Sequence, residues 1–255
     1  MKSLYVTWRG NEEGDQGVWS PVGRLDFDEG TYRFCYTKGA ETLRGFHLFS
    51  QMNDVNQVYE SDTLFPVFAN RMLSPSRSEY ESFLTWCGFD PSNAPDPVTL
   101  LGVTRGIRQT DSIEVFPCPV PDKNGWYVNT FFLQGAWGVY STAIDRFGNL
   151  EPDDKLFPIL DPCNVVSEKA NVLVVRIDDP VLIVGCVPRY LSNDMGPLIQ
   201  QRDPDEFVEL SVAQINKDAP LQQRVLCQMK ICWPDGFMPC SGEAFDSIPN
   251  GLKNV

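Results

Sequence analysis

The stretch of residues 131–199 constrains the fold of this chain most. An apolar, strand-like run, FFLQGAWGVY, opens it, and a run rich in Asp and Pro follows. Next comes a long run of β-branched residues, NVLVVRIDDPVLIVGCVPRYL, which leads into an apolar, helix-like segment. Because β-branched and aromatic side chains favour extended backbone, we expect the second half of the chain to be rich in strands.

Shorter patterns predict the remaining elements. Strands are marked by alternating apolar and polar residues, and helices by apolar residues at a spacing of three to four. The strands expected in the first half cover residues 4–8, 18–27, 32–36 and 112–116. The helices expected there cover residues 64–73 and 76–87, with a short one opening at 98–102. The second half is expected to add a helix at 191–201, interrupted at Gly196-Pro197, and strands at 206–216 and 224–233.

A proline-rich segment, residues 117–125, predicts a boundary between two domains. Its sequence, PCPVPDKNG, cannot continue a strand ladder or a helix, because proline lacks the backbone N–H. We therefore expect one domain at residues 1–120 and a second at 126–240. Residues 241–255 contain few large apolar side chains and are expected to form a mobile or partner-bound tail.

Charge and hydropathy narrow the classes of partner and compartment. The net charge is -13 and neither half contains a basic run, so the chain should repel the phosphate backbone of a duplex. Recognition of a nucleic-acid end in a small pocket needs few cations and stays compatible with this charge. The N-terminus lacks the pattern of a secretion signal, and no apolar window reaches the length of a membrane span. We expect a cytoplasmic protein that does not enter a membrane.

The chain contains 8 cysteines, most of them inside apolar or strand-like runs. Reduced, buried thiols of a cytoplasmic protein are the simplest interpretation. The spacing of Cys227, Cys232 and Cys240 leaves a zinc site as the alternative, although zinc sites usually contain tighter Cys pairs or histidine ligands.

No catalytic constellation is recognisable. The only histidine, His47, lies in an apolar run, where a buried or surface histidine is commoner than a catalytic one. The acidic pairs Asp153-Asp154 and Asp178-Asp179 are adjacent residues, which point to opposite faces of a strand or into solvent at a turn. Glycine-rich phosphate-binding loops are absent from the sequence. We therefore expect no enzyme, no cofactor and no metal.

The first half resembles the small N-terminal subdomain of HipA-type toxin kinases over roughly residues 3–117. The resemblance rests on LYVTW at residues 4–8, Val22-Gly23-Arg24-Leu25, the strand 32–36, the segment 64–72 and the run from Leu100 to Phe116. In that family an ATP-binding kinase body follows, and no such body is present here. The resemblance implies a β/α fold and a surface that docks a protein partner such as a HipA-like kinase, a repressor or another complex subunit.

The second half resembles a HIRAN domain over roughly residues 128–235. The resemblance rests on the run 132–140, on Asp161-Pro162-Cys163-Asn164 and on Val184-Gly185-Cys186-Val187-Pro188-Arg189. It implies a small β-barrel with short helices that binds the 3′ end of single-stranded DNA. Val166 and Ser167 stand where the family usually has a base-stacking tyrosine and an aspartate that holds the terminal hydroxyl.

The resemblance implies four nucleic-acid-binding residues, each with a structural alternative. Trp137 and Tyr140 would stack on bases, a contact worth about 1–3 kcal/mol per base, or would belong to the core. Arg189 would contact a phosphate or remain a solvated surface residue. Asn164 would hydrogen-bond a base or a hydroxyl group, or would form a turn after Asp-Pro.

We therefore expect an α+β, β-rich protein of two modules without catalytic activity. It is predicted to serve a prokaryotic or phage toxin–antitoxin, defence or DNA-processing assembly. The HipA-like half would dock a protein, and the HIRAN-like half would bind a single-stranded DNA 3′ end. The alternative is a purely protein-binding adaptor or inhibitor whose HIRAN scaffold has lost DNA binding.

Overall fold

The computed structural model of the chain contains two compact units. It describes residues 1–10, 19–108, 110–134, 150–161, 172–176, 181–200 and 207–249. The first unit comprises Met1–Tyr80, Pro95–Pro119 and Cys240–Val255, and the second comprises Glu81–Ala94 and Val120–Pro239. The chain thus leaves the first unit, visits the second at residues 81–94, and returns to the first with its last segment. That these units are a HipA-like and a HIRAN-like module stays a prediction.

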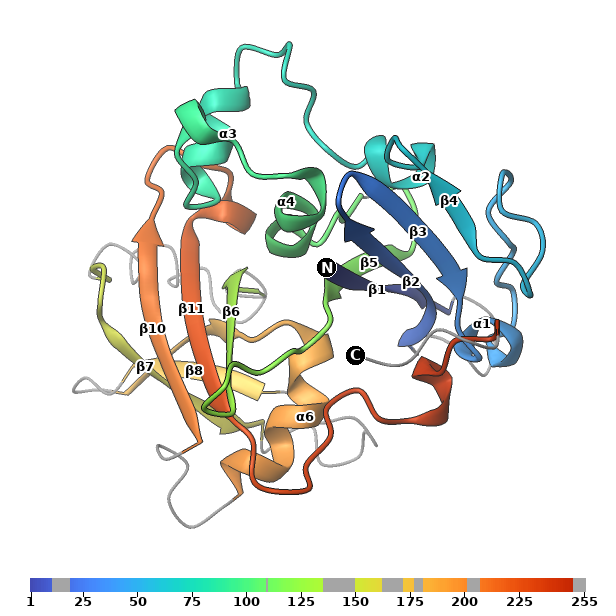
Figure 1. Ribbon diagram of the computed structural model, residues 1–255. Coiled ribbons are helices and arrows are strands. Elements are labelled where there is room, and N and C mark those ends of the chain that lie inside the picture. Colours follow the sequence, from blue (N-terminus) through green and yellow to red (C-terminus); the bar gives the residue numbers. More distant parts are fainter. Residues whose placement is uncertain are drawn as a thin grey trace. The chain divides into compact units, whose positions relative to one another are not determined.

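The first unit is built on a five-stranded antiparallel sheet in the order β4-β3-β2-β1-β5. Its strands are β1 (Lys2–Arg9), β2 (Trp19–Asp28), β3 (Thr31–Tyr36), β4 (Tyr59–Ser61) and β5 (Ile113–Pro117), shown in Figure 1. Glu29 and Gly30, both at positive φ, form the tight turn between β2 and β3. The strands predicted at 4–8, 18–27, 32–36 and 112–116 are confirmed. β1, β2 and β5 each bury runs of consecutive residues, so both of their faces are covered.

In the described residues, four short helical segments accompany this sheet: α1 (Gly39–Thr42), α2 (Pro66–Ala69), α4 (Pro97–Thr104) and the 3₁₀ turn η4 (Glu243–Phe245). The start of α4 follows from its sequence. The Asp96 carboxylate accepts hydrogen bonds from the backbone N–H groups of Val98 and Thr99, both at 3.1 Å, and Pro97 occupies the first helical position. The core beneath is rich in aromatic rings, with Phe34 and Phe68 fully buried.

The last described segment, residues 240–249, belongs to the first unit. Ser247 forms an antiparallel bridge with Thr37, and the backbone N–H of Ile248 donates to the Tyr36 carbonyl at 3.0 Å. Lys38 pairs with Asp246 at 3.1 Å. These contacts tie the described part of the predicted tail, residues 241–249, to the end of β3, and residues 250–255 lie outside the described residues.

The second unit is built on a six-stranded antiparallel sheet in the order β6-β11-β10-β7-β8-β9. Its strands are β6 (Trp126–Phe132), β7 (Lys155–Leu160), β8 (Val172–Arg176), β9 (Leu182–Cys186), β10 (Val208–Ile215) and β11 (Val225–Cys232). The helical segments are α3 (Tyr80–Trp86), which begins at the last residue of the first unit, α6 (Arg189–Ile199) and the 3₁₀ turns η1 (Pro91–Asn93) and η3 (Leu221–Gln223). The predicted richness in strands is confirmed.

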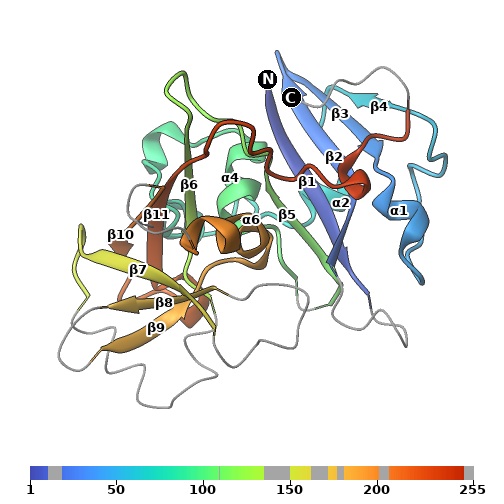
Figure 2. The same cartoon turned by 90° about the horizontal axis from the view of Figure 1, so that it is seen from below.

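One face of this second sheet is covered by α6, which lies beside β7 and β8 (Figure 2). Leu191, Met195 and Leu198 of α6 are buried in a core that otherwise consists mainly of valine and leucine side chains from the strands. The helix runs without interruption through Gly196 and Pro197, whereas the sequence predicts a break there. Pro197 has no N–H, so the helix passes it without the i to i−4 hydrogen bond that this position normally donates.

The prediction of a small β-barrel is wrong, although the α+β, β-rich fold class is correct. Within the described residues neither sheet closes into a barrel. In the part of the chain that the structure describes, the edges of the second sheet meet only at Gln134 and Cys186, which exchange two backbone hydrogen bonds of 3.0 and 2.8 Å. On the β9 side Pro188 follows closely and has no N–H to donate to a longer ladder, and residues 135–149 lie outside the described residues.

The helices of the first half are shorter than their predicted ranges. In place of a helix at 64–73 the chain forms the four residues of α2, which begins with Pro66. The predicted helix 76–87 begins only at Tyr80. The Ser78 hydroxyl before it donates to the neighbouring Glu79 carboxylate. Gly88, at a φ of +81°, follows the end of α3, where glycine commonly stops a helix. In the described residues no helix is long and apolar enough to cross a membrane.

Candidate functional site

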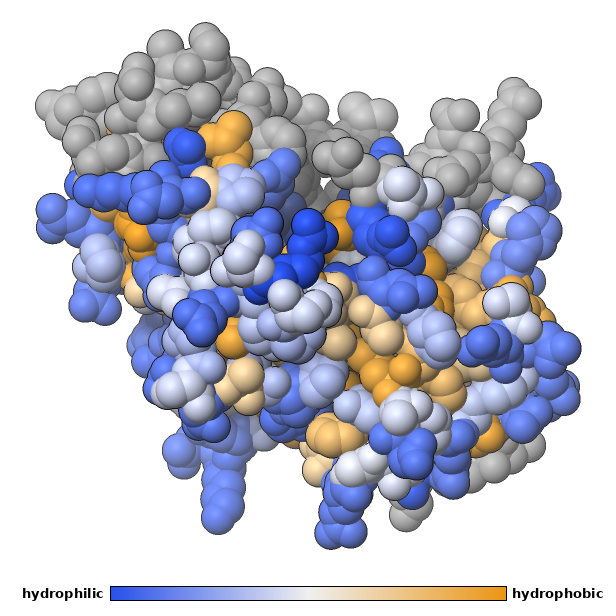
Figure 3. Space-filling view, turned by 90° about the horizontal axis from the view of Figure 1, so that it is seen from above, coloured by the Kyte–Doolittle hydropathy of each residue, from blue (hydrophilic) through white to orange (hydrophobic). Residues whose placement is uncertain are grey.

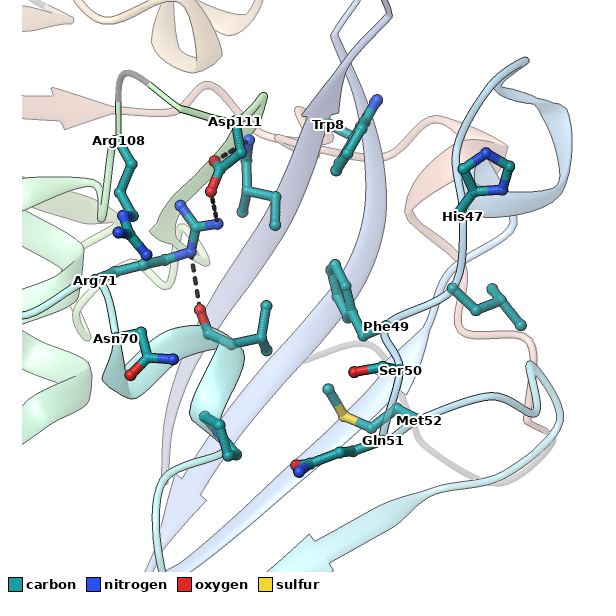
Figure 4. A pocket seen from close by; sticks show the side chains of 14 residues that line it. Trp8, His47, Phe49, Ser50, Gln51, Met52, Asn70, Arg71, Arg108 and Asp111 are labelled. Atoms are coloured by element: carbon teal, nitrogen blue, oxygen red, sulfur yellow. Dashed lines mark hydrogen bonds and ion pairs between the residues drawn. The ribbon is translucent and has the colours of Figure 1, made fainter.

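The main candidate site is a cavity of about 470 Å³ in the first unit (Figure 4). Its lining comes from four segments: β1, the loop 47–52, the region of α2, and residues 108–113 that lead into β5. The lining residues are Trp8, His47, Leu48, Phe49, Ser50, Gln51, Met52, Pro66, Val67, Asn70, Arg71, Arg108, Asp111 and Ile113. Its volume falls within the range of pockets that bind small molecules, about 300–1,000 Å³.

The loop that forms one wall is held by the hydroxyl of Tyr36, at the end of β3. This hydroxyl donates to the Met52 carbonyl at 2.5 Å and accepts from the Phe49 N–H at 2.8 Å. Burial raises the pKa of Tyr36 to about 12, so the hydroxyl stays protonated and keeps both bonds at physiological pH. The core of the first unit thus fixes the position of this wall.

Part of the lining is apolar and rigid. Phe49, Met52 and Ile113 are buried, and Trp8 is half-buried with its ring edge-on to Phe46 at 5.4 Å. Phe49 and Trp8 lie between the arginines and His47 in Figure 4. The cavity therefore offers a fixed aromatic and aliphatic surface against which a flat or branched apolar group can pack.

Arg71 links two of the segments that line the cavity through its hydrogen bonds. Its side chain is 3% exposed, and all three of its nitrogen atoms donate hydrogen bonds. Nε donates to the Val67 carbonyl at 3.0 Å, Nη1 to the Gly106 carbonyl at 2.9 Å, and Nη2 to the Asp111 carboxylate at 2.6 Å. Arg71 thus joins α2 to the segment before β5, and the charge of Asp111 offsets its own.

Arg108 is different, because its side chain is exposed and lies beside Arg71 in Figure 4. Within the described ranges Arg108 has no hydrogen-bond or ion-pair partner. Asn70, Gln51 and Ser50 add exposed amide and hydroxyl groups to the lining. The cavity therefore combines one guanidinium group that is available to a ligand with several neutral hydrogen-bonding groups.

The charge of this cavity contrasts with that of the whole chain. Two arginines and one aspartate line it, whereas the protein carries a net charge of -13. A cavity with a local excess of positive charge in an acidic protein favours an anionic group over a cationic one. His47 is exposed and lies in a loop instead of the strand-like run that the sequence indicates.

Most of the nucleic-acid-binding residues predicted in the second unit lie outside the residues that the structure describes. Trp137, Tyr140 and Asn164 lie outside the described residues, as do Val166 and Ser167. Arg189 is described: it is exposed and is the first residue of α6, directly after the capping Pro188. The structure therefore gives the position of one member of the predicted set.

A shallow groove of about 330 Å³ lies on the second sheet. It is lined by Lys155 of β7, by Glu209, Leu210 and Ser211 of β10, and by Gln228 and Lys230 of β11. Lys230 pairs with Glu209 at 3.5 Å, and the Lys155 ammonium lies over the Phe157 ring at 4.9 Å. Two lysines and one glutamate give this groove the same net positive charge as the cavity of the first unit. Its lining residues include no aromatic side chain, so it lacks the apolar wall of that cavity.

Among the described residues, no group of three or more histidine, cysteine or acidic side chains is arranged to hold a metal ion. Cys227 and Cys232 lie in the second unit and Cys240 in the first. Burial raises the pKa of Cys227 to about 12, which opposes the thiolate form that zinc requires. Arg24, in the segment that carries the HipA-type resemblance, is buried and pairs with Asp26 at 2.8 Å, which is a structural role.

Exposed apolar surface occurs in both units. On the face shown in Figure 3, hydrophobic residues in orange lie between hydrophilic ones in blue. The large hydrophobic side chains exposed in the described residues are Met1, Ile107, Val120, Val128, Ile159, Val181 and Met238. Ile107 is 50% exposed and directly precedes Arg108 of the cavity, so apolar surface and the available cation are neighbours in the chain.

Comparison with protein-family models, with curated proteins and with solved structures found no match for this chain. The HipA-type and HIRAN resemblances stay predictions.

Proposed function

We propose that this chain is a non-catalytic binding protein of a prokaryotic or phage toxin–antitoxin, defence or DNA-processing assembly. In this proposal the first unit docks a protein partner through the cavity beside Trp8 and Arg108. The partner would be a HipA-like kinase, a repressor or another subunit of the complex, and the protein would act in the cytoplasm.

The observation that carries the proposal is the composition of the cavity. It joins an aromatic and aliphatic wall to a guanidinium group that is exposed and has no partner within the described part of the chain. Arginine and aromatic side chains are the residues that most often dominate the energy of protein–protein interfaces. A rigid apolar wall also lowers the entropic cost of binding, because little has to be ordered when the partner arrives.

Co-purification tests the docking proposal. The tagged chain would be co-expressed with the products of neighbouring genes and purified, as wild type and as the variant Arg108→Glu. The proposal expects a stable complex for the wild type, insensitive to nuclease, and loss of the complex for the variant. A complex that survives Arg108→Glu unchanged would show that the partner binds elsewhere.

A second candidate function is the binding of a single-stranded DNA 3′ end by the second unit. It is favoured by Arg189, which is exposed at the start of the 11-residue helix α6. Pro188 provides no side-chain cap there, and the N-terminus of a helix attracts phosphate groups. Trp137, Tyr140 and Asn164 would complete this site.

Fluorescence anisotropy with short single strands tests this second function. Strands ending in a 3′ hydroxyl should bind more tightly than strands ending in a 3′ phosphate, and Arg189→Ala should weaken binding. Equal or absent binding of both strands would favour the alternative, a purely protein-binding adaptor or inhibitor. The net charge of -13 and the presence of Val166 and Ser167 support that alternative.

A further inference from the structure

The ligand class of the cavity in the first unit follows from its charge and its wall, if the cavity is the docking site proposed above. We infer that the cavity binds a single carboxylate that is attached to an aromatic or aliphatic group on a segment of the partner protein.

The charge of the lining fits a monoanion. Arg71 and Arg108 contribute two positive charges and Asp111 one negative charge, which leaves one net positive charge. A carboxylate carries one negative charge and would neutralise this excess. A phosphate monoester carries about -1.5 to -2 at neutral pH and would leave a surplus negative charge beside Asp111. The balance therefore favours a carboxylate over a phosphate.

The donor is Arg108. All donor nitrogens of Arg71 are engaged by Val67, Gly106 and Asp111, so Arg71 cannot turn towards a ligand without losing those bonds. Arg108 is exposed and has no partner within the described residues, so its planar fork is available for two parallel hydrogen bonds to one carboxylate. Asn70, which is exposed at the same side of the cavity in Figure 4, offers an amide group as a further donor.

The apolar group follows from the wall that adjoins this donor. Phe49 and Met52 are 8% and 2% exposed, so they form the base of this wall. The apolar surface that a ligand can reach comes from the half-buried side chains of Trp8, Leu48 and Val67. A carboxylate without an apolar neighbour would leave this surface in contact with water. A carboxylate joined to an aromatic or aliphatic group would cover the wall and hydrogen-bond to Arg108 at the same time.

The size of the cavity limits its occupant to one or a few residues. A volume of about 470 Å³ is that of a small-ligand pocket and accepts a side chain or a chain end, not an element of a folded domain. The cavity would thus provide the anchor of the docking surface, with the remaining contacts made around it.

Isothermal titration calorimetry with two small probes tests the inference independently of the partner. The probes are N-acetyl-L-phenylalanine, which has a carboxylate, and N-acetyl-L-phenylalaninamide, which is neutral and otherwise of similar shape. Because a hydrogen bond to a charged group is worth about 1.5–3 kcal/mol, the carboxylate probe should bind roughly tenfold or more tightly. N-acetylglycine and inorganic phosphate should both bind more weakly than N-acetyl-L-phenylalanine.

The variants identify the donor. Arg108→Gln should abolish the difference between the two probes, and Arg108→Lys should restore part of it, since lysine keeps the charge but not the fork. Arg77→Gln is the matched control, because Arg77 is an arginine of the same unit that is exposed at 61% and does not line the cavity. It should leave both affinities unchanged, and circular dichroism should give the same spectrum for all variants.

Three results would overturn the inference: equal affinity for the two probes, tighter binding of phosphate, or no binding of N-acetyl-L-phenylalanine at millimolar concentration. Probe binding tests the ligand class and co-purification tests the docking function, so either proposal can fail without the other. If the probes behave as expected but no partner is lost with Arg108→Glu, the docking function fails while the ligand class stands. If the partner is lost but the probes bind equally, the ligand class fails while docking stands.

Discussion

Replacing Asp111 by asparagine should destabilise the fold and at the same time tighten the binding of an anion in the cavity. One carboxylate oxygen of Asp111 accepts from Arg71 Nη2 at 2.6 Å, and the other accepts from the backbone N–H of Ile113 at 3.0 Å. Asparagine has nearly the same shape but only one oxygen. When that oxygen serves Ile113, an N–H group faces the buried guanidinium of Arg71, so the charge-assisted bond is lost.

The loss of stability in Asp111→Asn is limited by the hydrogen bonds that Arg71 keeps. Its bonds to the Val67 and Gly106 carbonyls remain, and the Asp111 side chain is 26% exposed, so water can reach part of the gap. Loss of one hydrogen bond to a charged group should lower the free energy of unfolding by about 1–3 kcal/mol. This is less than the removal of a partner from a fully buried ion pair, which costs about 3–5 kcal/mol.

The same substitution should strengthen the binding of an anion, although it weakens the fold. Asp111 lines the cavity, so an anion inside is repelled by its carboxylate over a distance on the order of 10 Å or less. At an effective dielectric constant between that of a protein surface and that of water, this repulsion is worth about 0.5–1.5 kcal/mol. Removing it should tighten the binding of N-acetyl-L-phenylalanine roughly two- to tenfold.

Two measurements on one variant check this. Urea unfolding followed by circular dichroism gives the change in free energy, and calorimetry gives the change in affinity. The control is Asp235→Asn, an exposed aspartate of the second unit, which should change neither value. If Asp111→Asn left stability unchanged, or weakened the carboxylate probe while the fold was intact, the electrostatic account of the cavity would be refuted.

Three further predictions concern the fold. In Gly185→Ala the new Cβ would lie 2.6 Å from the Leu133 side chain, so the variant should melt at a clearly lower temperature by differential scanning calorimetry, and an unchanged melting temperature would contradict the packing described. Tyr36→Phe removes a hydroxyl that bonds two backbone groups beside the cavity and should cost about 1–3 kcal/mol in urea unfolding, with a smaller loss counting against that role. Burial raises the pKa of Cys87 and Cys227 to about 12, so at pH 8 both should resist iodoacetamide in the native state and react after unfolding, as peptide mass spectrometry would show; rapid native labelling would disprove their burial.

Local sequence pattern predicted most of the strands, but not the short β4 or β7, which lies in the run rich in Asp and Pro. The runs 4–8 and 32–36 became β1 and β3, and 224–233 became β11. Helical spacing was a weaker guide. The apolar residues at 64–73 pack against the core, as the helical spacing predicts. Only the four residues from Pro66 to Ala69 are helical, however, and they form α2.

Long-range features could not be read from the sequence. Closure of the second sheet depends on how many residues pair between its two edges, and in the described residues only the Gln134–Cys186 bridge joins them. The cavity is likewise assembled from segments that are far apart in the chain. Its polar members, Arg108 and His47 among them, occur in no motif, and only the fold places them at one cavity with Trp8.

Chemical-shift mapping tests the central claim most directly. Isotope-labelled protein would be titrated with N-acetyl-L-phenylalanine, and two-dimensional NMR spectra would be recorded for the wild type and for Arg108→Gln. We predict that the largest shifts occur at the indole N–H of Trp8, the side-chain amides of Gln51 and Asn70, and the Arg108 side chain, and that they vanish in the variant. Shifts centred on other residues, or shifts of equal size in Arg108→Gln, would contradict a carboxylate site at this cavity.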